Sequence, residues 1–214
     1  MTEIVAQRRR DGIIAQAATF ATQFLRSPLS VGSPLASSGR LVRRMLGPLP
    51  WSRLDVIVGY GSGTGSFTPE ALQGLKPNGR LFAIDTDETF TQTLQETLPD
   101  GRLHALTGSA AEAHPLLAQH GVTHVDAIIS GLPFSSLDPG EAARILDVSE
   151  RLLAPDGLFV AYQVRSTLEE LLRTRFRTVD HDYEWRHLPP CHLLWAHGSG
   201  GDGHAASERE AAHA

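Results

Sequence analysis

Four glycines at alternate positions are the most informative local pattern of the chain. They directly follow a short apolar run at 54–58, at positions Gly59, Gly61, Gly63 and Gly65. Alternate glycines permit a tight turn and let a ligand approach the backbone closely. Twenty residues after the last glycine, Asp85 ends a second apolar run. Its carboxylate suits the hydroxyls of a ribose, so the two features together predict a site for a nucleoside-containing ligand.

The spacing separates this loop from two common nucleotide-binding loops. The Gly-x-Gly-x-x-Gly fingerprint fails, because a start at Gly59 puts Thr64 in the sixth place and a start at Gly61 puts Ser66 there. The P-loop pattern fails because no Gly-Lys-Ser/Thr follows. The remaining Gly-x-Gly-x-Gly is typical of enzymes that hold the amino-acid end of S-adenosylmethionine over such a loop. A glycine-rich turn without a ligand is the alternative.

A third position follows the apolar run at 103–106, where Gly108 and Ser109 occupy the place at which such enzymes face the adenine ring. Many of them use an aspartate to accept a hydrogen bond from the adenine amine, and Ser109 is expected to do so more weakly. The alternative is that Ser109 only caps the helix that follows.

Residues 130–134, with the sequence Ser-Gly-Leu-Pro-Phe, follow a fourth apolar run at 125–129. This segment resembles the Asn/Asp/Ser-x-Pro-aromatic motif that N-methyltransferases carry after their fourth strand. Backbone carbonyls there orient an amine, and an aromatic face favours the positive charge that grows on its nitrogen. The expected roles are amine orientation by Gly131 and Leu132 with Pro133, a cover by Phe134, and cofactor contact by Ser130. An apolar turn without a function is the alternative.

Three segments together give the chain a resemblance to bacterial phospholipid N-methyltransferases, relatives of the rRNA adenine dimethylases. They are 24–38, which ends in Val-Gly-Ser-Pro-Leu-Ala-Ser-Ser, then 130–134, and finally His-Leu-Pro-Pro at 187–190. Glycine at 131, in place of asparagine, fits the phospholipid branch. The resemblance implies stepwise methylation of phosphatidylethanolamine toward phosphatidylcholine, with S-adenosylmethionine as the methyl donor. It also implies that Ser37 and Ser38 approach the cofactor.

Two departures from that family stand out. The family usually opens the glycine loop with an acidic residue, and this chain has Gly59 there. A charged hydrogen bond that goes unmade would weaken cofactor binding by about 1–3 kcal/mol. In addition, His187 and Leu188 precede the two prolines, where an asparagine and an aliphatic residue are expected.

The order of apolar and helical segments predicts an α/β fold. Strands are expected at 54–58, 81–84, 103–106, 125–129 and 158–162, with helices at 68–75, 88–98, 110–119, 139–153 and 167–174. This alternation indicates a doubly wound parallel sheet. Two late strands, at 176–181 and 192–196, are expected to pair as an antiparallel end. The result is a mostly parallel seven-stranded sheet of the class I methyltransferase type, with an N-terminal helical extension.

The charge distribution suggests how the chain is organised. Residues 1–53 carry eight arginines and two acidic residues, a net charge of +6 that leaves −11 for the rest. Arg8, Arg9 and Arg10 precede an apolar stripe at helical spacing over 13–25, which suits an anionic membrane surface or a packed helix of the same domain. The expected domains are a basic, membrane-docking segment at 1–53, a methyltransferase domain at 54–197 and a disordered tail at 198–214.

Other residue types limit the function further. A single cysteine, Cys191, excludes an internal disulfide and a multi-cysteine zinc site, and no metal is expected. No apolar run approaches the roughly 20 residues needed to cross a bilayer. The single cysteine is typical of a reducing compartment, and the resemblance implies a peripheral membrane enzyme, so the expected location is the cytoplasm, at the inner face of the membrane. The partners expected are a phospholipid headgroup and the anionic membrane surface.

Three functions stay open at this point. The first is a phospholipid N-methyltransferase, for which Tyr60, Tyr162 and Tyr183 are possible neighbours of the amine proton. The second is a methyltransferase of RNA adenine or of a small amine, although the acidic body and Gly131 make nucleic acid an unlikely partner. The third is a non-catalytic relative that binds S-adenosylmethionine or lipid, which Gly59 motivates.

Overall fold

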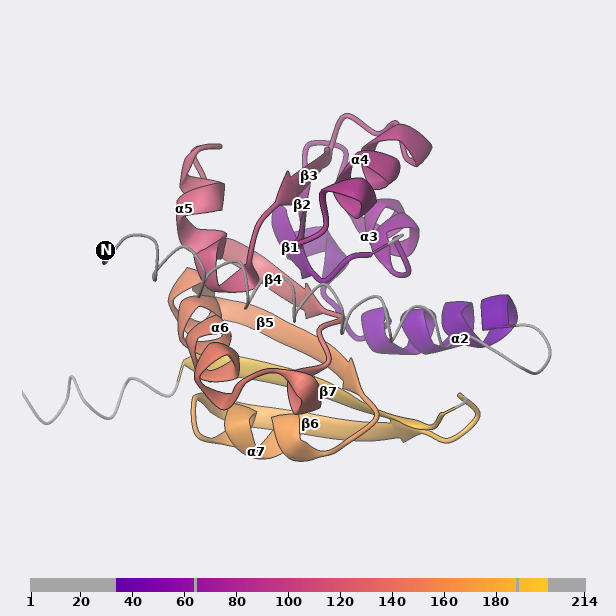
Figure 1. Ribbon diagram of the computed structural model, residues 1–214, viewed down its shortest axis with the longest axis vertical. Helices are drawn as coiled ribbons and strands as arrows, with labels where there is room; N and C mark the ends of the chain where they lie inside the picture. The colour runs from indigo at the N-terminus through magenta and orange to yellow at the C-terminus, as the bar shows by residue number, and fades with distance from the viewer. Residues whose placement is uncertain (1–33, 64, 188, 200–214) are drawn as a thin grey trace, which may run out of the picture. The chain divides into compact units, whose positions relative to one another are not determined.

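The computed structural model describes residues 34–63, 65–187 and 189–199, without the side chains of 34–38 and 199 (Figure 1). The expected amphipathic helix near the N-terminus lies outside these residues, and so do Thr64, Leu188 and the tail from residue 200. No helix within the described ranges is long and apolar enough to span a membrane.

Seven strands form one sheet in the order β3-β2-β1-β4-β5-β7-β6. The strands are β1 (Val56–Tyr60), β2 (Arg80–Asp85), β3 (Leu103–Thr107), β4 (Val125–Ser130), β5 (Leu153–Gln163), β6 (Phe176–Glu184) and β7 (Cys191–Ser199). The first five strands pair in parallel, and β7 pairs antiparallel with both β5 and β6. The predicted doubly wound sheet with an antiparallel end is confirmed.

Helices cover both faces of the sheet (Figure 1). The helices are α2 (Pro34–Leu46), α3 (Thr68–Gly74), α4 (Glu88–Thr97), α5 (Ala113–Ala118), α6 (Pro139–Leu152) and α7 (Thr167–Arg173), with short 3-10 turns η1 (Trp51–Arg53), η2 (Ala110–Glu112) and η3 (Phe134–Ser136). One apolar cluster joins α5, α6 and α7 to the sheet, and the other joins α2, α3 and α4. Neighbouring strand residues alternate between them, as Val58 and Ile57 do, because side chains along a strand alternate faces.

The carboxyl ends of the central strands meet at one edge of the sheet. Tyr60 at the end of β1 is in register with Ile84 on β2 and with Ser130 on β4. Ser130 is in turn in register with Ala161 on β5. The chain leaves β1 toward β2 on one side and has β4 on the other, so the strand order reverses there. In open α/β sheets, ligands bind in the crevice outside the carboxyl ends at this point.

The helix α2 packs on the sheet as part of the same compact unit as the strands. Met45 is fully buried, and the indole of Trp195 on β7 donates a 2.8 Å hydrogen bond to the Met45 carbonyl oxygen. The indole of Trp51 donates likewise to the Leu46 carbonyl, at 3.2 Å. These two bonds satisfy terminal carbonyls that a helix cannot pair internally. The described part of the segment 1–53 therefore belongs with the sheet domain.

Several element boundaries differ from the sequence prediction. The strand β5 begins at Leu153, five residues early, because Leu153 already pairs with Val125 across a register shift in β4. The strand β7 continues to Ser199, two residues into the expected tail. The single helix expected at 110–119 is divided into η2 and α5, and Pro115 lies in the first turn of α5, where its missing N–H costs no helix bond.

Candidate active site

The glycine loop after β1 adopts a backbone that suits only glycine. Gly61, Gly63 and Gly65 have φ of +62°, +50° and +91°, in the left-handed region that L side chains rarely adopt. A Cβ atom on Gly61 would lie 2.8 Å from Cδ2 of Leu132, and one on Gly65 would lie 2.7 Å from Cδ1 of Leu94. A Cβ on Gly63 would meet no described atom within 4 Å. The loop is therefore packed at Gly61 and Gly65 and open to a ligand at Gly63.

Asp85 holds this loop in place from the end of β2. One carboxylate oxygen accepts a 2.9 Å hydrogen bond from the Gly63 N–H, and the other accepts a 3.0 Å bond from the Asp87 N–H. Partial burial raises the pKa of the Asp85 carboxyl, and the backbone hydrogen bonds oppose that rise. Each oxygen keeps a second lone pair, so the carboxylate can still accept hydrogen bonds from a ribose diol.

Gly59, the position at which the acidic residue was expected, has no room for a side chain. A Cβ there would lie 2.8 Å from Cε2 of Phe67 and 3.0 Å from Oγ of Ser62. Phe67, the residue before α3, is 1% exposed. Its ring fills the space beside Gly59, which the sequence pattern did not reveal. The missing acid is thus accompanied by a change in the packing of the loop.

The turn 130–134 after β4 touches the glycine loop directly. The Gly131 N–H donates a 2.9 Å hydrogen bond to the Tyr60 carbonyl, and a Cβ on Gly131 would lie 3.1 Å from the Gly61 carbonyl oxygen. An asparagine, as in rRNA dimethylases, would be tightly placed here. Ser130 is fully buried and its hydroxyl accepts from the Leu132 N–H at 3.3 Å. The two predicted parts of the site are therefore neighbours.

Gln163, at the end of β5, is a site residue that sequence reasoning missed. Its Nε2 donates a 2.7 Å hydrogen bond to the Leu132 carbonyl oxygen, which also accepts from the Phe134 N–H at 3.0 Å. Both lone pairs of that carbonyl are thus engaged. The Gly131 carbonyl accepts no hydrogen bond from any residue that the structure describes. Gln163 is 5% exposed and ends an apolar strand, and that position was the only signal available in the sequence.

Comparisons with known proteins fit this geometry. No protein-family model matches the chain. An ornithine lipid N-methyltransferase of Singulisphaera acidiphila is 28% identical over 182 residues, which cover 84% of this chain and 94% of the relative. A ribosomal RNA small subunit methyltransferase H of Flavobacterium johnsoniae is 38% identical over 74 residues, covering 35% of this chain and 24% of the relative.

Solved structures show the same fold. A Haemonchus contortus phosphoethanolamine N-methyltransferase 1, in complex with phosphoethanolamine and S-adenosylhomocysteine, superposes with a TM-score of 0.65 at 17% identity over 89% of this chain, which spans about half of that structure's length (50%). The N-methyltransferase NodS from Bradyrhizobium japonicum superposes with a TM-score of 0.59 at 15% identity, covering 75% of this chain and 85% of NodS. The chain has the fold of class I, S-adenosylmethionine-dependent methyltransferases, so the predicted fold is confirmed. The name of the lipid N-methyltransferase relative agrees with the predicted enzyme class, and the S-adenosylhomocysteine in the two solved structures agrees with the predicted cofactor.

The residues of the glycine loop and the end of β2 fit S-adenosylmethionine. The open backbone at Gly63 and the half-buried carboxylate of Asp85 lie together at the switch point of the sheet, joined by a hydrogen bond. The first would lie under the amino-acid end of the cofactor, and the second would hold the ribose hydroxyls. The roles of Ser37 and Ser38 stay predictions, because their side chains lie outside the described residues.

Phe134 and Ser109 lie in packed surroundings. Phe134 is 4% exposed and its ring contacts Phe159 edge-on, at 6.4 Å between centroids. Its role as a cover for the amine stays a prediction. The hydroxyl of Ser109 accepts a 3.1 Å hydrogen bond from the Ala111 N–H and so caps η2, which is the alternative weighed for it. Among the described residues, no group of His, Cys, Asp and Glu is arranged to hold a metal.

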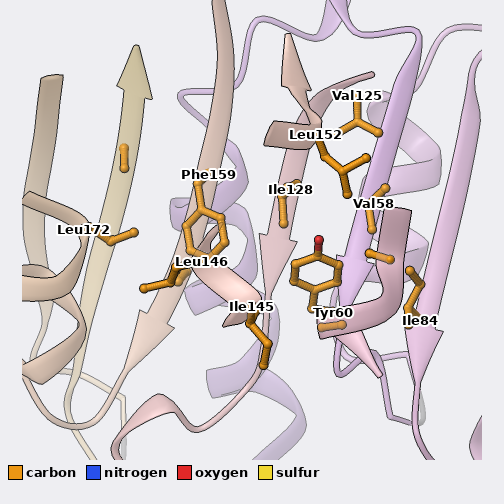
Figure 2. Close-up of a cluster of buried hydrophobic side chains, with 14 of the residues drawn as sticks. Val58, Tyr60, Ile84, Val125, Ile128, Ile145, Leu146, Leu152, Phe159 and Leu172 are labelled. Atoms are coloured by element: carbon orange, nitrogen blue, oxygen red, sulfur yellow. The ribbon is translucent and has the colours of Figure 1, made fainter. Parts of the chain in front are cut away.

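The three tyrosines considered as neighbours of the amine lie in different environments. Tyr60 is the last residue of β1, but its ring is buried among Ile128 and Ile145 in the apolar cluster that includes α6 (Figure 2). Tyr183 is 43% exposed. The Tyr162 hydroxyl lies 3.6 Å from the Cβ position of Gly131, so it is the one that borders the turn 130–134. Burial raises the pKa of Tyr162 above its usual value, which keeps the hydroxyl protonated at neutral pH.

Proposed function

We propose that this chain is an S-adenosylmethionine-dependent methyltransferase that methylates the amine nitrogen of a membrane lipid. The observation that supports it most directly is the contact between the glycine loop and the turn 130–134, where the Gly61 carbonyl lies against Gly131. A cofactor over the loop and an amine at the turn would then be adjacent. The relative named an ornithine lipid N-methyltransferase aligns over 94% of its own length, which favours a lipid amine over adenine.

Phosphatidylethanolamine is the substrate that we propose, with stepwise methylation toward phosphatidylcholine. Ornithine lipid is the second candidate, because the relative is named for it. Both molecules present a primary amine on an acylated body. With either lipid, the amine would have to enter at the carboxyl edge of the sheet and reach the turn after β4.

The polar groups around the turn would orient the amine. When bound, S-adenosylmethionine supplies an electrophilic methyl group. The Gly131 carbonyl and the amide oxygen of Gln163 are acceptors that no described residue uses, and each would accept one N–H of a neutral amine. Holding two N–H groups aims the nitrogen lone pair along a fixed direction. Attack of a neutral amine on a sulfonium disperses charge, so positioning and exclusion of water contribute most of the rate.

Removal of the amine proton needs an acceptor, and His192 is the one that we favour. The position of His192 on β7 is in register with Gln163 on β5. Burial lowers the pKa of His192, so the imidazole is neutral at pH 7 and can take a proton. Tyr162 would act as a hydrogen-bond partner rather than as the base, because its pKa is raised.

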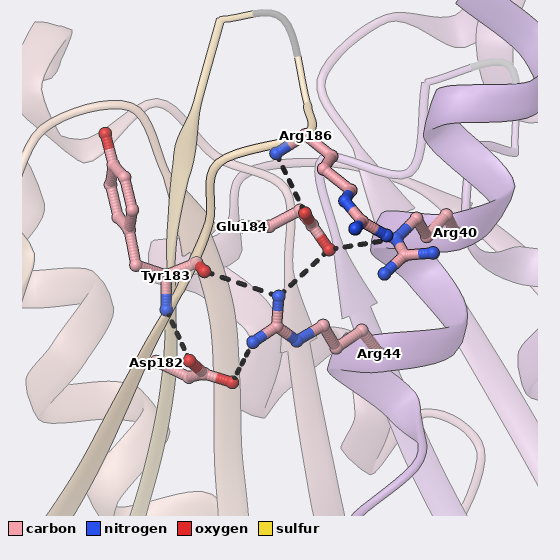
Figure 3. Close-up of polar contacts among 6 residues, drawn as sticks. All are labelled: Arg40, Arg44, Asp182, Tyr183, Glu184 and Arg186. Carbon is pink, nitrogen blue, oxygen red and sulfur yellow. Dashed lines mark hydrogen bonds and ion pairs between the residues drawn. The ribbon is translucent and has the colours of Figure 1, made fainter.

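Membrane docking by the N-terminal segment remains part of the proposal, although fewer of its arginines are available for the membrane than the sequence suggested. Arg40 and Arg44 on α2 form ion pairs with Glu184 of β6, at 3.3 and 3.0 Å (Figure 3). These two cations are therefore used within the sheet domain. The attraction to an anionic inner leaflet would come from Arg8, Arg9, Arg10 and Arg26.

The test is incubation of the full chain with S-adenosylmethionine labelled at the methyl group. Vesicles of phosphatidylethanolamine and phosphatidylglycerol, vesicles that also hold ornithine lipid, soluble ethanolamine and RNA are offered separately. Label in extracted phosphatidylethanolamine and its methylated products supports the proposal. Label only in ornithine lipid shifts the substrate to the second candidate. Label only in RNA or in the soluble amine overturns a lipid substrate, and no cofactor binding in calorimetry overturns the activity.

A further inference from the structure

The exposed large hydrophobic side chains of the described chain gather at one end of the sheet. They are Val164, Tyr183 and Trp185, which are 45%, 43% and 65% exposed. Val164 follows β5, and Tyr183 and Trp185 lie at the end of β6 and in the turn after it. Because β5 and β6 are both antiparallel to β7, they run in the same direction. Their carboxyl ends therefore lie at the edge that carries the glycine loop.

Exposed arginines accompany these side chains. Arg165 follows Val164, and Arg186 follows Trp185 with its guanidinium 4.8 Å from the centre of the Trp185 ring. The two nearest acidic residues, Asp182 and Glu184, are paired with Arg44 and Arg40 of α2 (Figure 3). We call Val164, Arg165, Tyr183, Trp185 and Arg186 the edge patch. It presents apolar and cationic groups, while the carboxylates beside it are neutralised.

The edge patch is connected to the amine-orienting turn through the strands. Gln163, which bonds to the Leu132 carbonyl, is the residue before Val164. Across the sheet, Gln163 is in register with His192, and His192 is in register with Tyr183. The Tyr183 and His192 rings are in edge contact at 4.9 Å. One rung of the sheet thus runs from the turn after β4 to the patch.

We propose that the edge patch docks on an anionic bilayer surface and delivers the lipid amine to the Gly131–Gln163 site. This proposal rests on the lipid substrate proposed above. Tryptophan and tyrosine favour the interface between headgroups and acyl chains, because one end of each ring system is apolar and the other polar. Arginines beside them attract anionic headgroups. Five residues are too few for a standard protein interface, which takes about 20–30 residues on each side.

Quenching of Trp185 by brominated lipid tests the contact directly. The full chain is mixed with vesicles of phosphatidylglycerol and acyl-brominated phosphatidylcholine, and its fluorescence is compared with that of Trp185→Phe. Trp195 is buried and Trp51 partly buried, so they serve as internal controls. We expect the quenched fraction to disappear in Trp185→Phe. Equal quenching in the two proteins, or none in the wild-type chain, overturns the proposal.

Vesicle affinity and turnover separate this proposal from the lipid substrate. Trp185→Ser is expected to lower vesicle affinity about tenfold by removing buried apolar area, and Arg186→Ser about fivefold. Arg151→Ser, an exposed arginine at the end of α6, is the matched control and should change nothing. Methyl transfer to monomeric dihexanoyl phosphatidylethanolamine should be unchanged in all three variants.

The outcomes are distinguishable. Quenching of Trp185 without methylation of any lipid would overturn the proposed lipid substrate but not the docking proposal. Methylation of vesicle lipid without quenching would overturn the docking proposal alone. If Trp185→Ser instead converts a dimer into a monomer in size-exclusion chromatography and leaves vesicle binding unchanged, the patch is a protein interface and the proposal fails.

Discussion

The Nε2 atom of Gln163 donates a 2.7 Å hydrogen bond to the carbonyl oxygen of Leu132, which joins the end of β5 to the turn after β4. This bond fixes the orientation of the amide, because only its nitrogen can donate to a carbonyl. The amide oxygen must then face the other way. In the sequence, Gln163 is simply the last residue of a strand. In the structure, this bond fixes the direction in which its amide oxygen points as an acceptor in the proposed amine site.

Replacing Gln163 by leucine tests this arrangement. We expect Gln163→Leu to lower kcat/KM for methyl transfer by roughly 10- to 100-fold, since a lost hydrogen bond of this kind is worth about 1–3 kcal/mol. Calorimetry should give an unchanged affinity for S-adenosylmethionine, because Gln163 does not touch the glycine loop. An equal loss in cofactor affinity and turnover would contradict a specific role toward the amine.

Restoring the family's acidic residue at Gly59 should damage the protein. Because Phe67 and Ser62 already fill the space, Gly59→Glu is expected to reduce the free energy of unfolding by about 1–3 kcal/mol. Urea denaturation measures this loss. Gly101→Glu, at a glycine with no described atom within 4 Å of its Cβ position, is the matched control. In a double-mutant cycle, Gly59→Glu should cost less stability in a Phe67→Ala background than beside Phe67, and an equal cost in the two backgrounds would refute the packing argument.

Acid sensitivity should depend on Glu184. The backbone N–H of Arg186 and the guanidinium of Arg44 hold the pKa of Glu184 at about 2, against 4.5 for a free glutamate. A lowered carboxyl pKa stabilises the fold above about pH 4.5, and this stabilisation is lost as the pH falls toward 2. The difference in Tm between the wild-type chain and Glu184→Gln should therefore shrink over that interval.

The control for this experiment is Asp156→Asn, an exposed carboxylate outside the ion pairs of the described residues. Its Tm difference from the wild-type chain, measured over the same pH range, gives the effect of removing a carboxylate that lies outside these ion pairs. A Glu184→Gln difference that changes no more with pH than this control would show that the arginines do not hold Glu184 in its charged form.

Deleting residues 1–26 should weaken vesicle binding without removing the active site. The deletion takes away Arg8, Arg9, Arg10 and Arg26, and it leaves every described residue in place. We expect reduced flotation with phosphatidylglycerol vesicles at low salt, and a smaller difference at 0.5 M salt because screening weakens the attraction. Transfer to monomeric short-chain lipid should persist. Unchanged flotation at low salt would remove the N-terminal segment from the docking proposal.

The helices and strands that show a local sequence pattern were the easiest to predict. The apolar runs and the glycine punctuation placed the strands and helices, since both report on short stretches of chain. The beginning of β5 at Leu153 was missed, because its pairing with Val125 depends on a partner far away in the sequence. The division of the helix at 110–119 was also missed, although the Ser109 cap and Pro115 that accompany it are local in the sequence.

The site was predictable where one residue type carries the signal. The alternate glycines, Asp85 and the turn 130–134 could be found because their spacing is constrained by the backbone. Phe67 and Gln163 could not, since each acts through a neighbour brought close only by the fold. Phe67 looks like any core aromatic residue, and the bond from Gln163 joins residues 31 positions apart.

The indole bonds from Trp51 and Trp195 to the last turn of α2 have a mechanical consequence. The Trp195 bond fastens that helix to β7, and the arginines of α2 fasten it to the end of β6. We therefore expect α2 and the hairpin of β6 and β7 to move together. A tilt of α2 would then reach the rung that contains Gln163, and with it the proposed amine site.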